Sequence, residues 1–437
     1  MPPRKRQRPC GVTATAPPPP TLPADLLVEI VARTDDAPTL FRCAAACRLL
    51  RREILDPAFG RRVRSRWPDG GVLLGFLCPG NATLFSLVHP GTPEAASLAD
   101  NHLARFMSRS AADLLEEYEH VTSRGGLVVL ERREAYLARR RLDGDRASDM
   151  CVWNPMTGDR AFLPFPPDVW PDVWPPPGDH LCPVHTYVLL TGAADGIGSP
   201  FLLLAADLSG LGDSSRCIKV RTVSSDAGGS WGPVMTHAGD PGMPLGVPSI
   251  GDNGRVVDDA VVGVVHWLMC GYILTYDVGA AAVGMIELPG DGLRHYILYL
   301  GSTPEGNLSL FYSLHGFTIF YWVMSSPGGG WRLRAEVDTF PMLRSMMPMA
   351  PWEEEEEDND DDDYYDGDRK FMMKHDSRVD VEGIGDKRSS FLLLWFGYWR
   401  FVLDLETAKI HWADGWAKYG IPYTVDLSSR LSAMKSY

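Results

Sequence analysis

Few residues of this sequence stand at spacings that enzymes use for catalysis or metal binding. It contains no G-x-S-x-G, H-E-x-x-H, P-loop or dinucleotide-binding motif. The eleven histidines include no pair at ligand spacing beside a third donor, and the eight cysteines form no C-x-x-C. Asp258 and Asp259 are adjacent, so on a strand their carboxylates would point to opposite faces. We therefore expect no catalytic residue, no metal site and no cofactor.

Charge is segregated into blocks along the chain. Residues 353–368 hold twelve acidic residues and no base, and they account for most of the net charge of −14. Like-charge repulsion predicts a disordered acidic loop at about 352–369, without the glycine-punctuated spacing of a calcium loop. Binding of a basic partner is the alternative interpretation. The basic run from Arg4 to Arg8 is either a nuclear import signal or a solvated tail.

The composition is that of a folded protein with more than one unit. The 437 residues are 45% hydrophobic and include thirteen Trp, 43 Gly and 35 Pro. No apolar run reaches about 18 residues, and the first residues lack the apolar stretch of a secretory signal. The scattered cysteines indicate free thiols in a reducing compartment. We expect a protein of the cytoplasm or the nucleus, or both, with no membrane and no nucleic-acid partner.

The N-terminal part divides into a tail and a helical segment. Residues 1–20 are basic and rich in proline, which predicts a disordered tail. Residues 21–66 show the periodicity of helices, interrupted by an acidic and proline-containing break at 35–38. Two apolar stripes result, and they consist of Leu22, Leu26, Leu27, Ile30 and Val31, followed by Leu40, Cys43, Cys47, Leu50 and Ile54.

From residue 70 the apolar period changes to that of strands, and helix signals are confined to about 98–119. Short β-rich runs separated by turn residues are predicted at 72–77, 84–88, 126–130, 187–191, 201–205, 218–223, 261–268, 272–276, 308–312, 318–324, 391–396 and 400–405. A loose repeat, in which a strand ends in Asn or Asp before a small-residue turn, occurs at Asn154, Asp277 and Asp404. Longer-turn variants run from Ser224 to Trp231 and from Ser325 to Trp331. One repeat unit spans roughly 40 to 50 residues, the scale of a propeller blade, which predicts a β-propeller-like domain of about six blades at 70–437.

The tryptophans near the strand ends have two interpretations. Trp153, Trp231, Trp267, Trp331, Trp395, Trp399 and Trp412 are expected to pack between neighbouring sheets, and a recognition face is the alternative. Trp170 and Trp174, within a proline-rich stretch, are expected on an exposed loop.

The stretch from Leu22-Pro23 to Cys47-Arg48 resembles the F-box motif, with the Leu-Pro opening, the Leu-Leu-x-x-Ile core and the Cys-Arg ending in family order. The rest of the chain resembles the F-box-associated, kelch-like β domains of plant proteins. The resemblance implies an α+β multidomain protein in which an F-box helical bundle at 21–66 precedes the propeller-like domain. It implies adaptor-binding residues at Leu22, Pro23, Leu26, Leu27, Ile30, Val31, Leu40, Cys47 and Leu50.

The implied function is that of a non-catalytic substrate receptor in a cullin-based ubiquitin ligase. Its partners would be a Skp-type adaptor, through it a cullin, and a protein substrate whose identity and binding residues the sequence does not specify. Thr34 stands where the family usually has Leu, and Leu50 where it usually has Trp, which is expected to weaken the adaptor contact. The alternatives are an interaction scaffold with a degenerate F-box and a propeller glycoside hydrolase, which would need two converging carboxylates.

Overall fold

The computed structural model describes residues 22–33, parts of 43–59, 71–79, 85–88, 111–133, 149–169, 185–192, 199–239, 255–256, 263–290, 298–347, 379–384, 391–413 and 421–426, with short gaps in several ranges, and single residues 242, 244 and 293. Most of these residues are in strands and few are in helices. The predicted tail at 1–20 and the acidic loop at 352–369 lie outside the described residues. So do Thr34, Trp170 and Trp174.

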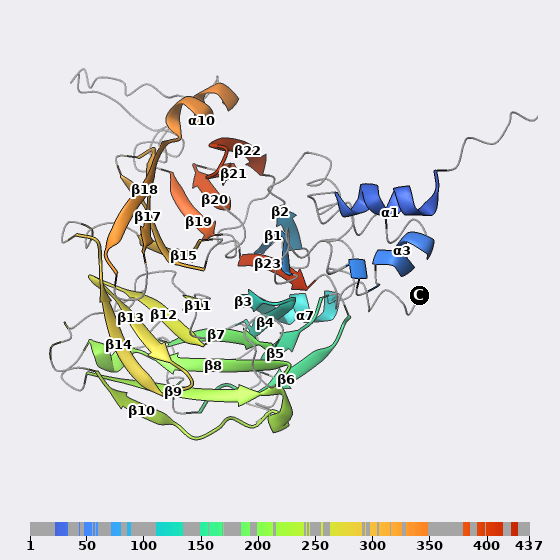
Figure 1. Ribbon diagram of the computed structural model, residues 1–437. Coiled ribbons are helices and arrows are strands. Elements are labelled where there is room, and N and C mark those ends of the chain that lie inside the picture. The colour runs from blue at the N-terminus through green and yellow to red at the C-terminus, as the bar shows by residue number, and fades with distance from the viewer. Residues whose placement is uncertain are drawn as a thin grey trace, which may run out of the picture.

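Five four-stranded antiparallel sheets follow one another along the chain, arranged as the blades of a propeller (Figure 1). Blade 1 contains β3 (Tyr118–Arg124), β4 (Leu127–Arg132), β5 (Met150–Trp153) and β6 (Arg160–Leu163). Blade 2 contains β7 (His185–Thr191), β8 (Phe201–Asp207), β9 (Cys217–Ser224) and β10 (Met235–Ala238). Blade 3 contains β11 (Arg255–Val256), β12 (Val264–Met269), β13 (Tyr272–Asp277) and β14 (Ala282–Glu287). Blade 4 contains β15 (Leu298–Ser302), β16 (Leu308–Leu314), β17 (Thr318–Met324) and β18 (Trp331–Asp338), and blade 5 contains β19 (Asp380–Ile384), β20 (Phe391–Phe396), β21 (Trp399–Asp404) and β22 (Lys409–Ala413).

A sixth sheet joins the two ends of the β region. It has three strands among the described residues, in the order β2 (Phe85–Val88), β1 (Gly71–Pro79) and β23 (Ile421–Asp426). The register places Gly71 opposite Asp426, so the chain enters β1 where it leaves β23. This closing sheet unites segments some 350 residues apart, a pairing with a large loop-closure cost that the surrounding sheets must offset. The described residues thus form five complete blades plus this sheet, where about six blades were predicted.

The first strand of each blade lies toward the centre of the ring. β3 contacts both β7 and β23, and β19 contacts both β15 and β23. The outermost strands β6, β10, β14, β18 and β22 lie at the rim (Figure 1). The middle strands are therefore covered on both faces by neighbouring blades, which explains their continuous apolar runs.

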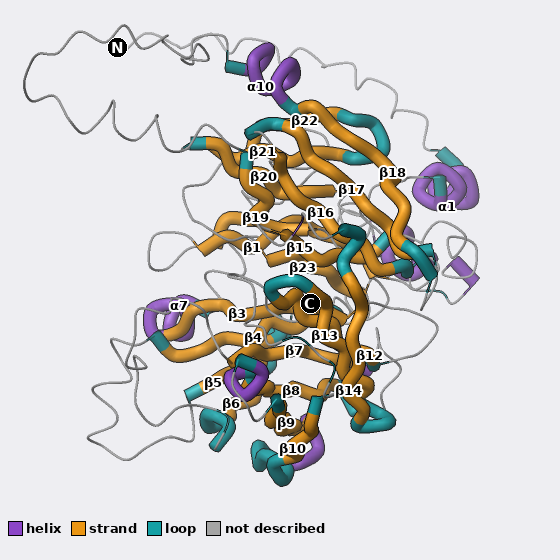
Figure 2. Tube along the Cα trace, turned by 90° about the vertical axis from the view of Figure 1, so that its left-hand side faces the viewer, coloured by secondary structure: helices purple, strands orange, loops and turns teal. Residues whose placement is uncertain are grey.

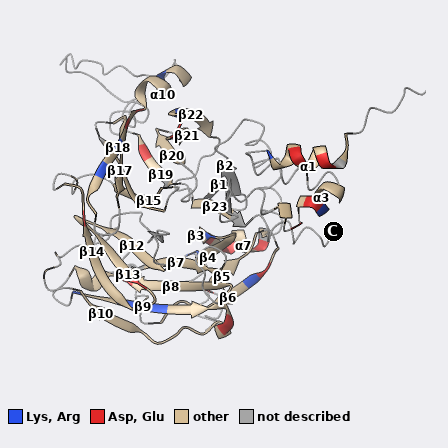
Figure 3. Cartoon of the chain, viewed as in Figure 1, with Lys and Arg blue, Asp and Glu red and all other residues tan. Residues whose placement is uncertain are grey.

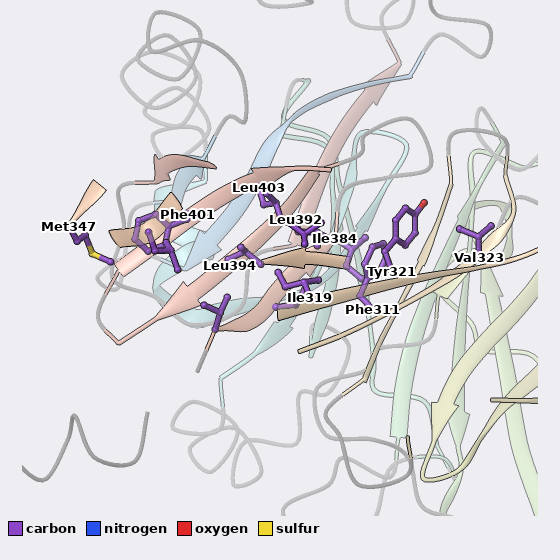
Figure 4. Packing of buried hydrophobic residues seen from close by; sticks show 14 residues of the cluster. Phe311, Ile319, Tyr321, Val323, Met347, Ile384, Leu392, Leu394, Phe401 and Leu403 are labelled. Atoms are coloured by element: carbon purple, nitrogen blue, oxygen red, sulfur yellow. The ribbon is translucent and has the colours of Figure 1, made fainter. Parts of the chain in front are cut away.

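Packing between blades supplies the core. Between blades 4 and 5, Phe311 and Ile319 pack with Leu394 and Phe401, all nearly inaccessible to solvent (Figure 4). Equivalent clusters join blades 1 and 2, blades 2 and 3, and blades 3 and 4. Each fully buried Leu, Ile or Phe stabilises the fold by about 1.5–3 kcal/mol relative to an exposed position.

The helices are short, and they are α1 (Ala24–Ala32), α3 (Arg48–Ile54), α7 (Ala112–Glu117), α10 (Phe340–Met346) and the 3₁₀ turns η2 (Ser209–Leu211) and η3 (Ser225–Ala227). Helix α7 packs Leu114 and Leu115 with Trp153 of blade 1 and Tyr423 of β23. Asp113 of α7 accepts a hydrogen bond of 2.7 Å from Arg160 of β6, and this contact lowers the pKa of the Asp113 carboxyl. The helix thus fills the space between blade 1 and the closing sheet (Figures 1 and 2).

The predicted repeat corresponds to one position in three blades, the turn between the third and fourth strands. In blade 1 the Asn154 Oδ1 accepts from the Thr157 N–H at 3.2 Å, and in blade 3 the Asp277 Oδ1 accepts from Ala280 at 2.8 Å. In blade 5 the Asp404 Oδ1 accepts from Glu406 at 2.9 Å. These side chains satisfy turn amides, which is why Asn or Asp stands there.

The longer-turn variants place a tryptophan against the preceding blade. The Trp231 Nε1–H of blade 2 donates to the Pro164 carbonyl after blade 1 at 2.9 Å, and the Trp331 Nε1–H of blade 4 donates to Glu287 of blade 3 at 2.7 Å. Trp153 and Trp267 are fully buried, as the packing interpretation predicts, whereas Trp412 is 45% exposed.

Candidate partner-binding surface

Helix α1 begins immediately after Pro23, which is its N-terminal flanking residue. The amides of Leu26 and Leu27 both donate to the Pro23 carbonyl at 3.1 Å, so the first turn closes on this residue. Asp25 in the first turn places a negative charge near the positive end of the helix dipole. The Leu-Pro opening thus begins the helix at a defined position.

Two large apolar side chains of α1, and a third just before it, are in contact with solvent. Leu22, Leu26 and Ile30 are 53%, 51% and 56% exposed. Leu26 and Ile30 are four residues apart and lie on one side of the helix, and Leu22 immediately precedes Pro23; we call these three residues the α1 ridge. The adjacent face is turned inward, because Val31 is 4% exposed and Leu27 is half-buried. An apolar ridge of this kind commonly marks a binding surface.

Helix α3 supports α1 from its inward side. The two helices are in contact, and Leu50 and Ile54 of α3 are buried, as is Phe59 in the turn that follows. In that turn the Asp56 Oδ1 accepts a hydrogen bond from the Ala58 amide at 2.7 Å. The inward residues therefore hold the helix pair together and leave the ridge to solvent.

Charged side chains flank the ridge without covering it. The Arg33 guanidinium pairs with Glu29 one turn earlier at 3.0 Å, and Arg52 pairs with Glu53 at 2.9 Å. Both pairs are exposed, so each contributes at most about 0.5 kcal/mol. Figure 3 shows acidic and basic residues on these two helices, while the visible strands are mostly uncharged.

The predicted adaptor-binding residues fall into three groups. Leu22, Pro23, Leu26 and Ile30 are exposed, and Leu27 is half-buried beside them. Val31 and Leu50 are buried within the chain, so they act on a partner only by shaping the helix pair. Leu40 and Cys47 lie outside the described residues.

A cluster of carboxyl groups, absent from the sequence-based expectations, lies on blade 1 toward blade 2. Glu119 of β3 stands opposite Glu131 of β4, and Glu131 is half-buried. Burial, and then the charges of Glu119 and Asp149, raise the pKa of Glu131 to about 8. Burial also raises the pKa of the Tyr187 hydroxyl on the facing blade. Glu131 is thus a neutral acid at neutral pH.

In the part of the chain that the structure describes, no group of three or more His, Cys, Asp or Glu side chains is arranged to hold a metal ion. None of the helices described is long and apolar enough to cross a membrane.

The fold and the α1 ridge define a β-propeller protein preceded by a helix pair with an exposed apolar face. The family model for the domain of unknown function DUF7595 matches residues 88–335, more than half of the chain. The chain therefore belongs to this family, and the matched segment extends from the end of β2 through most of β18. None of the curated proteins compared with the chain matches it.

Similar solved structures include the extracellular domain of BT4673 from B. thetaiotaomicron, with 7% identity over 69% of this chain and 28% of that chain and a TM-score of 0.29. A protein from Lactobacillus plantarum has 11% identity over 70% of this chain and 85% of that chain, with a TM-score of 0.31. Prolyl oligopeptidase B from Galerina marginata has 11% identity over 67% of this chain and 33% of that chain, with a TM-score of 0.29. The chain thus spans less than a third of the length of the BT4673 extracellular domain and about a third of that of the oligopeptidase.

Proposed function

We propose that the protein is a substrate-receptor subunit of a cullin-based ubiquitin ligase. In this proposal residues 21–66 form an F-box that binds a Skp-type adaptor, and the propeller binds the protein to be modified. The chain performs no chemistry itself. It raises the effective concentration of a substrate lysine near the conjugating enzyme. The protein then acts in the cytoplasm, the nucleus or both.

The observation that carries the proposal is the exposed α1 ridge. It combines with the Leu-Pro opening and the Leu-Leu-x-x-Ile core, on which the resemblance to the F-box rests. A helix that presents apolar residues at i and i+4, here Leu26 and Ile30, suits insertion into an apolar groove of another protein. Full burial of a Leu or Ile side chain contributes about 1.5–3 kcal/mol, so the half-exposed ridge residues have roughly 1 kcal/mol each left to gain from a partner.

The experiment is a pull-down and affinity measurement with a purified Skp-type adaptor. The test variants are Leu26→Asp and Ile30→Asp, which place a charge on the ridge without touching the inward face. Each change removes apolar contact and desolvates a carboxylate, so we expect each to weaken binding by at least tenfold.

The matched control is Phe162→Asp, because Phe162 is 44% exposed on β6 of the propeller and lies apart from the ridge. It should bind the adaptor like the unchanged chain. An unchanged chain that fails to bind the adaptor, with the propeller folded by circular dichroism, would instead favour a scaffold with a degenerate F-box. Equal affinity of the ridge variants would show that the adaptor binds elsewhere.

A further inference from the structure

The outermost strand of each blade has one free edge. β6, β10, β14, β18 and β22 end their sheets at the rim, so alternate residues turn backbone N–H and C=O groups outward. Another strand can pair with such an edge. Folded proteins usually prevent this with very short edge strands, charged side chains, bulges or a covering element.

Four of these five edges carry one or more of these protections. β6 and β10 have only four residues each. β18 carries four charged side chains, and the register of its pairing with β17 shifts between Tyr321 and Trp322. β22 begins with Lys409 and is in contact with helix α10.

The edge of β14 has none of these protections. All six of its residues pair with β13 in an unbroken register, and each is at least partly accessible to solvent. Its one charged residue is the last, Glu287. At Gly284 an added Cβ would lie 2.7 Å from the Thr275 hydroxyl of β13, so glycine is required there and the middle of the edge bears no side chain. The edge is therefore regular, and it is uncharged over residues 282–286.

Exposed apolar side chains of three consecutive rim strands gather around this edge. Met235 of β10, Met285 of β14 and Leu333 of β18 are between 39% and 47% exposed. Met235 faces blade 3, because its cross-strand partner Val220 belongs to the cluster between blades 2 and 3. Leu333 faces blade 3 from the other side, because its partner Trp322 packs on the cluster between blades 3 and 4. A strand added to β14 would thus meet apolar side chains on both of its faces.

The sequence of β14 itself has the character that such an added strand needs, because it is extended, uncharged over most of its length and apolar on both faces. If two copies of the chain pair antiparallel about Gly284, Met285 lies opposite Val283 of the second copy. Ala282 then lies opposite Ile286 of the second copy. Residues directly opposite each other share a face of the sheet, so apolar side chains meet on both faces.

Glu287 fixes the centre of this pairing. The Trp331 Nε1–H of blade 4 already donates to the Glu287 carbonyl at 2.7 Å. A pairing centred one residue later would place Glu287 opposite Val283 of the second copy, and it would require the Trp331 contact to be exchanged. The pairing centred on Gly284 leaves Glu287 outside and places no charged residue of β14 within the contact.

We propose that two copies of this chain pair edge to edge through β14, in the antiparallel register centred on Gly284. A twofold pairing uses the β14 edge of both copies, so the assembly closes at the dimer. The contact is one strand pair with a few flanking side chains. We therefore expect a total buried area below about 1,200 Å² and a Kd on the order of 10 μM.

The β14 edge is remote from the proposed adaptor-binding surface. Helix α1 and β14 lie on opposite sides of the molecule, so the dimer leaves both α1 ridges accessible (Figure 1). The dimer does not rest on the proposed function. Only its consequence, that one dimer carries two adaptors, rests on that function.

The first experiment is sedimentation equilibrium of the full chain, without adaptor, over about 1 to 200 μM, a range that brackets the expected Kd. The average mass should rise with concentration from 48.3 kDa toward twice that value. Met285→Lys places a charge in the apolar contact and should raise the Kd at least tenfold. The matched control is Phe162→Lys, because Phe162 is similarly exposed on the rim strand β6 of blade 1, and this variant should dimerise like the unchanged chain. Circular dichroism checks that both variants are folded.

The second experiment tests the register by disulfide cross-linking with oxidised glutathione. Opposite residues of an antiparallel pair have Cα atoms about 4.5–5.5 Å apart, which suits a disulfide. A chain with both Val283→Cys and Met285→Cys should give a cross-linked dimer on a non-reducing gel. Either change alone should give no more than the unchanged chain, whose exposed Cys270 sets the background.

Four results would overturn the proposal. They are an unchanged chain that stays monomeric throughout the concentration range, assemblies larger than a dimer, undiminished dimerisation of folded Met285→Lys, and cross-linking by Met285→Cys alone that equals that of the double variant. Because neither experiment contains adaptor, each of these results leaves the proposed adaptor binding untouched. The variants of the α1 ridge test that binding separately.

Discussion

The carboxyl of Glu131 makes the stability of the propeller depend on pH in a predictable direction. Glu131 and Glu119 are cross-strand neighbours on one face of blade 1, and like charges at such positions are destabilising. The buried guanidinium of Arg132 does not compensate them, because adjacent strand residues point to opposite faces. There Arg132 pairs with Glu117 and donates to the Tyr118 hydroxyl at 2.6 Å.

The direction in which stability changes with pH follows from the raised pKa of Glu131. The folded chain holds the Glu131 proton up to about pH 8, whereas the unfolded chain releases it near the ordinary value of 4.5. Between these values the folded state binds one proton more than the unfolded state, so the free energy of unfolding falls as pH rises. The contribution of protonated Glu131 to stability is therefore fully present below pH 4.5 and is lost as pH rises to about 8. A shift from 4.5 to about 8 corresponds to an upper bound of about 5 kcal/mol. Partial solvent access at Glu131 screens the charge, so about 2 kcal/mol is the expected effect.

The perturbation is Glu131→Gln, which keeps the shape and hydrogen-bonding capacity of the neutral acid but does not ionise. We expect the variant to match the unchanged chain at pH 4.5 and to be more stable by about 2 kcal/mol at pH 8.5. The assay is urea unfolding of both chains from pH 4.5 to 9, followed by tryptophan fluorescence. Comparison at each pH cancels the titration of all other groups.

Glu116→Gln is the matched control, because Glu116 is exposed on α7. It should follow the unchanged chain at every pH. Glu119→Gln should give part of the stabilisation, since it removes the second cause of the raised pKa. A Glu131→Gln chain that is no more stable at pH 8.5, or whose advantage is the same at pH 4.5, would refute the reasoning.

Three other perturbations have defined outcomes. Trp331→Phe removes the indole donor to the Glu287 carbonyl, so urea unfolding should show a loss of about 1–2 kcal/mol, and an unchanged midpoint would mean that this contact between blades is energetically neutral. Asp404→Ala leaves the turn amide of Glu406 without its acceptor and should cost about 1 kcal/mol, whereas Asp404→Asn should restore most of the stability in the same assay. Burial raises the pKa of the Cys151 thiol to about 12, so mass spectrometry should show iodoacetamide labelling of Cys151 only in urea; labelling of the native chain as fast as of exposed Cys270 would contradict this.

Much of the blade architecture follows from local patterns. The second strand of every blade (β4, β8, β12, β16 and β20) coincides with a predicted apolar run. The third strands β9, β13, β17 and β21 do so as well. Both faces of these strands are covered by neighbouring sheets, so their sequences are almost uniformly apolar and visible without tertiary information. The turn residues Asn154, Asp277 and Asp404 were found for a similar reason, because a side chain that bonds its own turn leaves a local signature.

The inner strands β3, β11, β15, β19 and β23 were missed, as were the rim strands β10 and β18. In β3 and β18, partial exposure mixes polar and apolar residues. Helix α10 was missed too, because only a proline near its start indicates a helix in so short a segment.

The sequence by itself determined the periods, namely the two helical stripes that include Leu26 and Ile30 and the strand-forming runs, because these depend on residues close together in the chain. Only the tertiary structure decided that Leu26 and Ile30 face solvent while Val31 and Leu50 are buried. It also decided that Glu131 stays protonated and that Met235, Met285 and Leu333 gather at the rim of blade 3. These properties arise from contacts between residues far apart in sequence, and the pairing of β1 with β23 sets the geometry that brings them together.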